Sequence, residues 1–176
     1  MRAPSVPYLE IALGGIWWIV GAAALGGGLS TVVLAAGIGV AAALVVALRQ
    51  RYGAGEALPP GRRGRLLRLI VGSLVVIAVA ATGLGYLGYA ELTIPVACGV
   101  VGAGLVMSSP VLDARPLVAA GSVLLLLGAV GAVLALGSAG PLYPHGLVGL
   151  GAGAGLWLFG AQRTGLLAEV RDRTRR

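Results

Sequence analysis

The run LSTVVLAAGIGVAAALVVALRQR, from Leu29 to Arg51, decides the fold class. Its stretch from Leu29 to Leu48 carries no charge, and about 20 apolar residues in a helix are enough to cross the roughly 30 Å hydrocarbon core of a bilayer. The apolar residues are continuous rather than alternating, which favours a helix over a barrel strand. Arg49-Gln50-Arg51 then form a basic stop. The pattern predicts a transmembrane helix.

The composition of the whole chain agrees with this prediction. Of 176 residues, 58% are hydrophobic and 11% are charged, against roughly a quarter charged in a soluble domain. The mean hydropathy is +0.97. So few charged side chains cannot cover the surface of a soluble protein of this length. We therefore expect a polytopic integral membrane protein.

Six apolar runs together predict an all-α fold, a six-transmembrane-helix bundle of three tandem hairpins in one domain, 1–176. The expected spans are about 11–25, 29–48, 69–89, 92–112, 117–136 and 142–161. Residues 49–68 are expected to be a basic cytoplasmic loop and 162–176 an Arg-rich cytoplasmic tail. The first hairpin is alternatively re-entrant, because its outer turn, Gly26 to Gly28, is so short.

The arginines predict the orientation of these spans. Every basic residue is Arg, and with six spans all of them fall on one side, while the loops 26–28, 89–91 and 137–141 contain none. Basic residues of short loops stay in the cytoplasm. We expect a multi-pass protein of the plasma (inner) membrane with both termini cytoplasmic. The net charge of +7 is then a product of topology, and no nucleic-acid partner is expected.

Several kinds of chemistry are excluded or disfavoured by missing residue types. The chain has no Lys, so no side-chain amine can form a Schiff base. Cys98 and His145 are the only residues of their kinds, which removes an intramolecular disulfide, a thiolate metal cluster and a multi-histidine metal site. No catalytic residue, metal or cofactor is predicted, and the chain is not expected to be an enzyme.

One polar group at the outer face is a candidate site. Glu91, His145 and Tyr143 are expected near the outer ends of their helices. They either form a polar site together or serve as ordinary interfacial residues, because charged and aromatic side chains are common at that depth. Ionisable residues near the bilayer midplane are not expected, which weakens ion-coupled transport as a function.

The basic segment before the third span is a second candidate. Arg62, Arg63, Arg65 and Arg68 are candidate contacts for anionic lipid head groups. Their alternative role is to set the topology, with the arginine stems extending along the membrane interface. Both roles are compatible, and the second alone explains the residues.

Glycines are the third candidate feature, because small residues let membrane helices approach closely. The candidate packing positions are Gly99, Gly102, Gly104, Gly151 and Gly155. They either pack the helices within this chain or form an interface with a partner. A repeat also joins the first and fifth spans: Gly14 and Gly21, and Gly121 and Gly128, are each seven residues apart, so each pair lies on one helix face.

These features resemble the HdeD-type acid-resistance membrane proteins. The resemblance rests on the opening LGGIWWIVG, Leu13 to Gly21, on the basic stop ALRQR, Ala47 to Arg51, and on six spans in three hairpins. It extends over the whole chain. It implies a stress-associated membrane protein without enzymatic activity.

The expected function is that of a non-catalytic small integral membrane protein that acts through helix packing and through lipid or partner contacts, as an accessory subunit or stress-response component. Its expected partners are the bilayer, anionic head groups, and a membrane protein or a second copy of the chain. The alternative is a small transporter or its substrate-binding membrane subunit. A polar cavity near the centre would favour transport, whereas a glycine-sealed core with an apolar groove would favour the accessory role.

Overall fold

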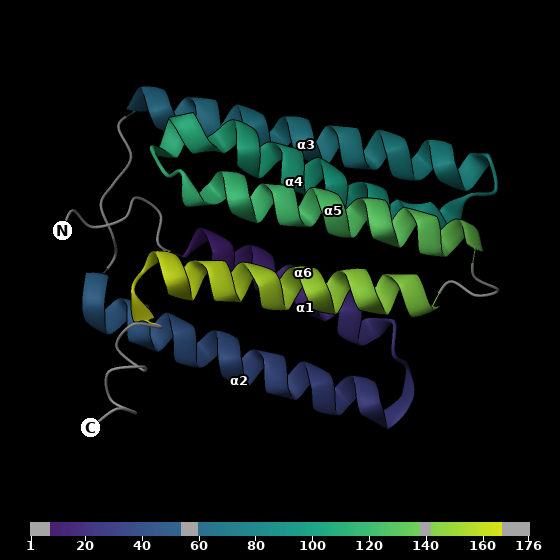
Figure 1. The fold of residues 1–176 in the computed structure, drawn as a ribbon, viewed down its shortest axis with the longest axis horizontal. Helices are drawn as coiled ribbons and strands as arrows, with labels where there is room; N and C mark the ends of the chain where they lie inside the picture. The colour runs from purple at the N-terminus through teal and green to yellow at the C-terminus, as the bar shows by residue number, and fades with distance from the viewer. Residues whose placement is uncertain (1–7, 54–59, 138–141, 167–176) are drawn as a thin grey trace.

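The computed structural model describes residues 8–53, 60–137 and 142–166, and these residues contain helices and turns but no strand. The prediction of an all-α chain is confirmed (Figure 1). The elements are α1 Leu9–Ala23, α2 Gly27–Tyr52, α3 Pro60–Tyr86, the short 3₁₀ helix η1 Ala90–Leu92, α4 Thr93–Leu112, α5 Pro116–Gly137 and α6 Leu142–Arg163.

Four of these helices are long and apolar enough to cross a membrane. They are α2, α3 from Gly61, η1 together with α4, and α5. Helix α1 has 15 residues, and α6 has 22 but contains Tyr143, Pro144, His145 and many glycines, which lower its mean hydropathy. The four helices fit a multi-pass membrane protein.

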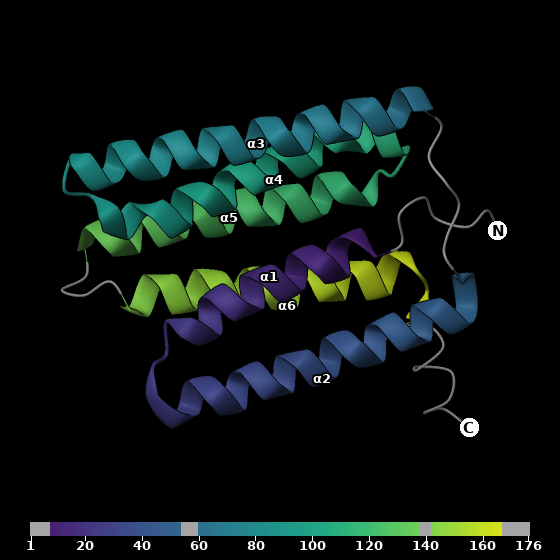
Figure 2. The same ribbon diagram turned by 180° about the vertical axis from the view of Figure 1, so that it is seen from behind.

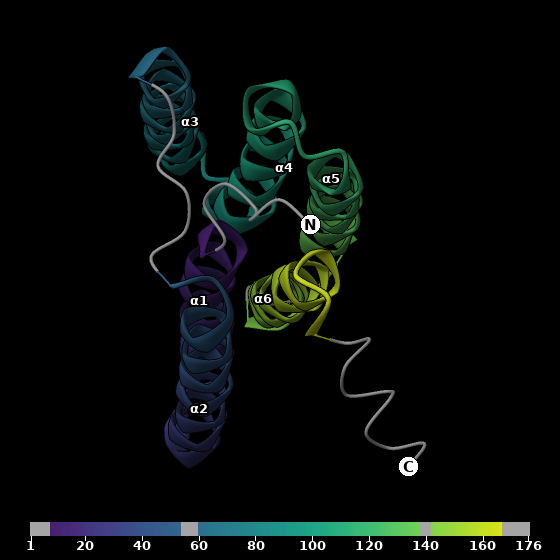
Figure 3. The same ribbon diagram turned by 90° about the vertical axis from the view of Figure 1, so that its left-hand side faces the viewer.

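The helices run roughly along one axis, with α1, α4, α5 and α6 at the centre and α2 and α3 outside them. The end view separates a column of α3, α1 and α2 from a curved row of α4, α5 and α6 (Figure 3). The view from behind places α1 directly over α6 (Figure 2). The tightest packing joins α4 to α5 and α1 to α6, so the closest neighbours belong to different hairpins of the sequence.

Burial follows this arrangement. Cys98, Leu124, Val148 and Leu156, from α4, α5 and α6, are almost inaccessible. In contrast, α2 has only Gly37 and Leu48 fully buried, and most of α3 is exposed, with Val79 at 68%. Both outer helices are apolar around most of their circumference, so they need an apolar environment on the side that the protein leaves uncovered.

The basic segment differs from the expected loop at 49–68. Arg49 and Arg51 lie in the last turn of α2, and the arginines from Arg62 to Arg68 lie in the first turns of α3. Arginine is a good helix former, and proline is favoured in the first turn, so the helix begins at Pro60, well before the apolar run. Residues 54–59, the loop 138–141 and the tail from 167 onward lie outside the described residues.

Candidate functional site

The closest helix crossing joins α1 to α6 through glycines. A Cβ on Gly149 would lie 2.5 Å from the Cα of Gly21, and a Cβ on Gly153 would lie 2.9 Å from the carbonyl oxygen of Gly14. Neither position has room for a side chain. The Gly14 and Gly21 pair of the repeat therefore forms one face of α1 that lies against the backbone of α6.

A second crossing of the same kind joins α4 to α5. A Cβ on Gly121 would lie 2.5 Å from the carbonyl oxygen of Gly102, and a Cβ on Gly128 would lie 2.9 Å from the amide nitrogen of Gly99. The two seven-residue glycine pairs thus have equivalent positions in the structure. Each lies on a central helix where that helix meets its nearest neighbour.

The five glycines expected to pack helices have different surroundings. Gly99 and Gly102 lie in the α4–α5 crossing, and a Cβ on Gly104 would lie 3.0 Å from the Ser73 hydroxyl of α3. A Cβ on Gly151 would make an ordinary contact with Leu127 at 3.4 Å, and one on Gly155 would have no atom of another described helix within 4 Å.

The tight glycine pair of α6 is instead Gly149 and Gly153. It has the same four-residue spacing as Gly151 and Gly155 but points about 200° away around the helix, given about 100° per residue. Both pairs have the same spacing and overlap in the sequence, so the sequence did not show which pair meets α1.

Two tryptophans connect α1, α2 and α6. The rings of Trp18 and Trp157 stack with their centroids 5.0 Å apart. The indole N–H of Trp18 donates to the carbonyl oxygen of Val33 at 2.8 Å, and that of Trp157 donates to the carbonyl oxygen of Ile11 at 3.2 Å. Buried indole N–H groups thus have backbone acceptors, and the pair fixes α2 beside the α1–α6 crossing.

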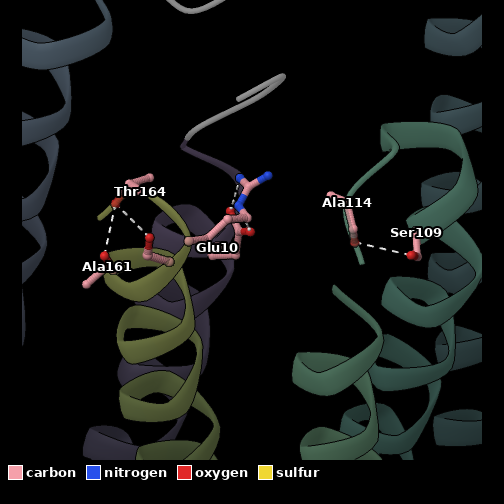
Figure 4. Close-up of polar contacts among 7 residues, drawn as sticks. Glu10, Ser109, Ala114, Ala161 and Thr164 are labelled. Atoms are coloured by element: carbon pink, nitrogen blue, oxygen red, sulfur yellow. Dashed lines mark hydrogen bonds and ion pairs between the residues drawn. The ribbon is translucent and has the colours of Figure 1, made fainter. Parts of the chain in front are cut away.

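A buried ion pair closes one end of the α1–α6 pair. Arg163 Nε lies 2.7 Å from Glu10 Oε1, and an Arg163 terminal nitrogen donates to Glu10 Oε2 at 2.8 Å. The two side chains thus form an ion pair that includes one charge-assisted hydrogen bond. The Glu10 side chain is 1% exposed and that of Arg163 is 8% exposed. Figure 4 shows Glu10 beside the last turns of α6.

Hydrogen bonds surround this ion pair. The Thr164 hydroxyl donates to the carbonyl oxygen of Gly160 at 2.8 Å, and the Tyr52 hydroxyl donates to the carbonyl oxygen of Thr164 at 3.0 Å. The Tyr8 hydroxyl donates to the carbonyl oxygen of Gly53. Together these contacts hold the start of α1 to the ends of α2 and α6. No pattern in the sequence indicated the ion pair, because its partners are 153 residues apart.

At the opposite end, the candidate polar site is partly assembled. His145 and Glu91 do meet, but Nε2 of His145 lies 2.9 Å from the backbone carbonyl oxygen of Glu91. With a carbonyl as the acceptor, Nε2 is the protonated nitrogen. The contact joins the start of α6 to η1 and does not involve the Glu91 carboxylate. The Tyr143 side chain lies outside the described residues.

The described arginines gather at one end of the bundle. They lie at the end of α2, the start of α3, the turn between α4 and α5, and the end of α6 (Figure 1). Arg62, Arg63, Arg65 and Arg68 are exposed. Within the described part of the chain, none of these four has an acidic partner within ion-pair distance.

Two apolar grooves open on the surface between helices. The first, of about 150 Å³, lies between α3, α4 and the start of α1. The second, of about 350 Å³, lies between α1 and α2 and is lined by Trp18, Gly37 and Trp157 among others. Both are lined almost entirely by carbon.

The comparisons with known proteins add no relative. The chain matches no protein-family model, no curated protein and no solved structure. The resemblance to the HdeD-type proteins therefore stays a prediction from the sequence.

Proposed function

We propose that the chain is a non-catalytic, multi-pass membrane protein whose six helices all cross the bilayer, and that it acts through helix packing and contacts with lipid or a membrane partner. Its place is that of an accessory subunit or a stress-response component of the plasma membrane. The observation that carries the proposal is the pair of tight glycine crossings between central helices, beside outer helices with exposed apolar faces.

The apolar outer surface supports a bilayer environment. Leu74, Val76 and Val79 of α3 and Val32 and Ile38 of α2 are each more than half exposed. Such a surface would associate in water, whereas lipid chains solvate it. Helix α1 packs against α2 and α6, and α6 packs against α1, α5 and α4, so a bilayer that surrounds α2 to α5 also encloses them.

The gathering of arginines supports the orientation. Under the positive-inside rule, the end that bears the described arginines is cytoplasmic. Glu91, in contrast, lies at the arginine-free end. Both termini then face the cytoplasm.

The tight glycine crossings favour contact functions over transport. At both glycine crossings, backbone meets backbone without space for a solute. The two grooves described above face outward and are apolar, which suits lipid chains or apolar helices rather than a hydrated substrate.

The proposal can be tested by native mass spectrometry of the chain purified in nanodiscs. We expect phospholipid, a second copy or another membrane protein to remain bound. Stoichiometric retention of a polar small molecule, or its uptake into sealed proteoliposomes, would contradict the proposal and support the transporter alternative.

A further inference from the structure

The groove between α3, α4 and α1 has the features of a lipid site. Its α3 side is formed by Leu66, Leu69, Ile70, Ser73, Leu74 and Ile77. The groove is open because small residues face one another there: Gly104 lies against the Ser73 hydroxyl, and the Ser108 hydroxyl bonds back to the carbonyl oxygen of Gly104 at 2.7 Å. The volume of about 150 Å³ accepts an apolar group about the size of benzene.

Two arginines precede the groove-lining residues of α3 and lie on the same face of that helix. At about 100° per residue, Arg62 and Arg63 each lie within about 50° of the centre of the groove-lining face, whereas Arg68 lies about 170° away. Arg65 is about 110° away by the same count. Both flanking guanidiniums are exposed, and within the described residues neither has an acidic partner.

The length of the groove matches one leaflet. From Leu66 to Ile77, α3 rises by about 16 Å at about 1.5 Å per residue, which is close to half of the roughly 30 Å hydrocarbon core. The positive charges lie at the end where head groups of the cytoplasmic leaflet would be. The occupant therefore has a negative head, and part of its apolar chain lies in the groove.

We infer that this groove binds an anionic phospholipid of the cytoplasmic leaflet, with its phosphate between Arg62 and Arg63 and one acyl chain against Ser73 and Gly104. The inference rests on the proposed function, because it requires the chain to lie in a bilayer. It deepens that function by naming the partner and the residues that select it.

Photo-crosslinking in nanodiscs tests the site. Phosphatidylglycerol and phosphatidylcholine would each carry a diazirine on one acyl chain, and crosslinks would be mapped by peptide mass spectrometry. We expect the phosphatidylglycerol probe to label residues 66–77 and 101–108 several-fold more than the phosphatidylcholine probe. Equal labelling by the two probes would overturn the inference.

Charge-matched variants separate the site from general attraction. Arg62→Gln with Arg63→Gln should remove most of the several-fold preference for phosphatidylglycerol, while Arg65→Gln with Arg68→Gln, which removes the same charge, should leave most of it. Equal losses in the two pairs would mean that the arginines attract lipid without a site, and the inference would fail.

A pair of groove variants tests the acyl chain. Ile70→Trp places a ring in the groove, and Val71→Trp places the same ring on an exposed face outside it. Only the first should abolish labelling of 101–108; unchanged labelling in that variant would overturn the inference. Diffuse labelling of all exposed helices would contradict the lipid site but agree with the membrane proposal. No labelling of any helix would contradict both.

Discussion

Glu10 and Arg163 hold the first and last described helices together through one buried ion pair. Taking two charges out of water is costly, and the mutual attraction and hydrogen bonds offset that cost only while both partners are present. Replacing one partner removes the attraction but not the cost of burying the other group. This pair is therefore sensitive to substitution of either residue.

Glu10→Gln should lower the free energy of unfolding by about 3–5 kcal/mol, because it removes the carboxylate charge that offsets the cost of burying the Arg163 guanidinium. Denaturant titration in mixed micelles would measure the change. In the control, Glu10→Leu combined with Arg163→Met should restore most of the stability, since an apolar pair of similar volume is often neutral. A loss of under about 1 kcal/mol in the single variant would show that the contact contributes little.

The contact between His145 and Glu91 gives a prediction that separates backbone from side chain. His145→Ala should cost about 0.5–1.5 kcal/mol, the usual net value of one hydrogen bond, whereas Glu91→Gln should change little because the acceptor is the backbone carbonyl. Thermal unfolding of the two variants side by side would measure this. An equal loss in Glu91→Gln would instead assign a role to the carboxylate.

The sequence was least informative about the contacts of single side chains. It brought His145 and Glu91 into one candidate group, but it could not indicate that the carbonyl accepts. Nothing in the sequence joined Glu10 to Arg163, 153 residues away. Contacts between residues far apart in the sequence depend on how the helices pack, and helix periodicity does not contain that information.

Among the elements, the glycine crossings set the distances between the central helices. Gly149 and Gly155 are six residues apart on α6, yet only Gly149 meets the backbone of α1. Where backbones touch, a single methyl group forces the helices apart, and overpacking of this kind typically costs 1–3 kcal/mol.

Gly149→Ala should therefore reduce stability by about 1–3 kcal/mol, and Gly155→Ala should be neutral or slightly stabilising because its side chain meets no other described helix. Unfolding of both variants in the same micelles would test the register. A larger loss of stability in Gly155→Ala than in Gly149→Ala would contradict the glycine face of α6 assigned to the crossing with α1.

The helices themselves were largely predictable. The apolar runs located all six, within a few residues at most ends, because a bilayer-length run has few alternatives. The start of α3 was missed by nine residues, Leu69 against Pro60, since hydropathy marks the apolar part of a helix and not its basic first turns. The glycine repeat marked α1 and α5 as related helices. Nothing in the sequence indicated that α1 packs closest to α6 and α5 closest to α4.

For the molecule as a whole, we propose that all six helices cross a bilayer with the arginine-bearing end inside. Four helices satisfy the length and hydropathy required, and α1 and α6 are packed among them. If α6 did not cross, the C-terminal end would lie outside, because α5 runs away from the arginine-bearing end.

Cysteine labelling of intact cells with a membrane-impermeant maleimide tests this six-span topology and its orientation. Cys98 is fully buried, so the parent chain serves as the silent background for Tyr89→Cys, Arg65→Cys and a cysteine added after Arg176. We predict that only Tyr89→Cys is labelled in intact cells and that the other two react only after lysis. Labelling of Arg65→Cys from outside would contradict the orientation, and labelling of the C-terminal cysteine from outside would contradict six spans.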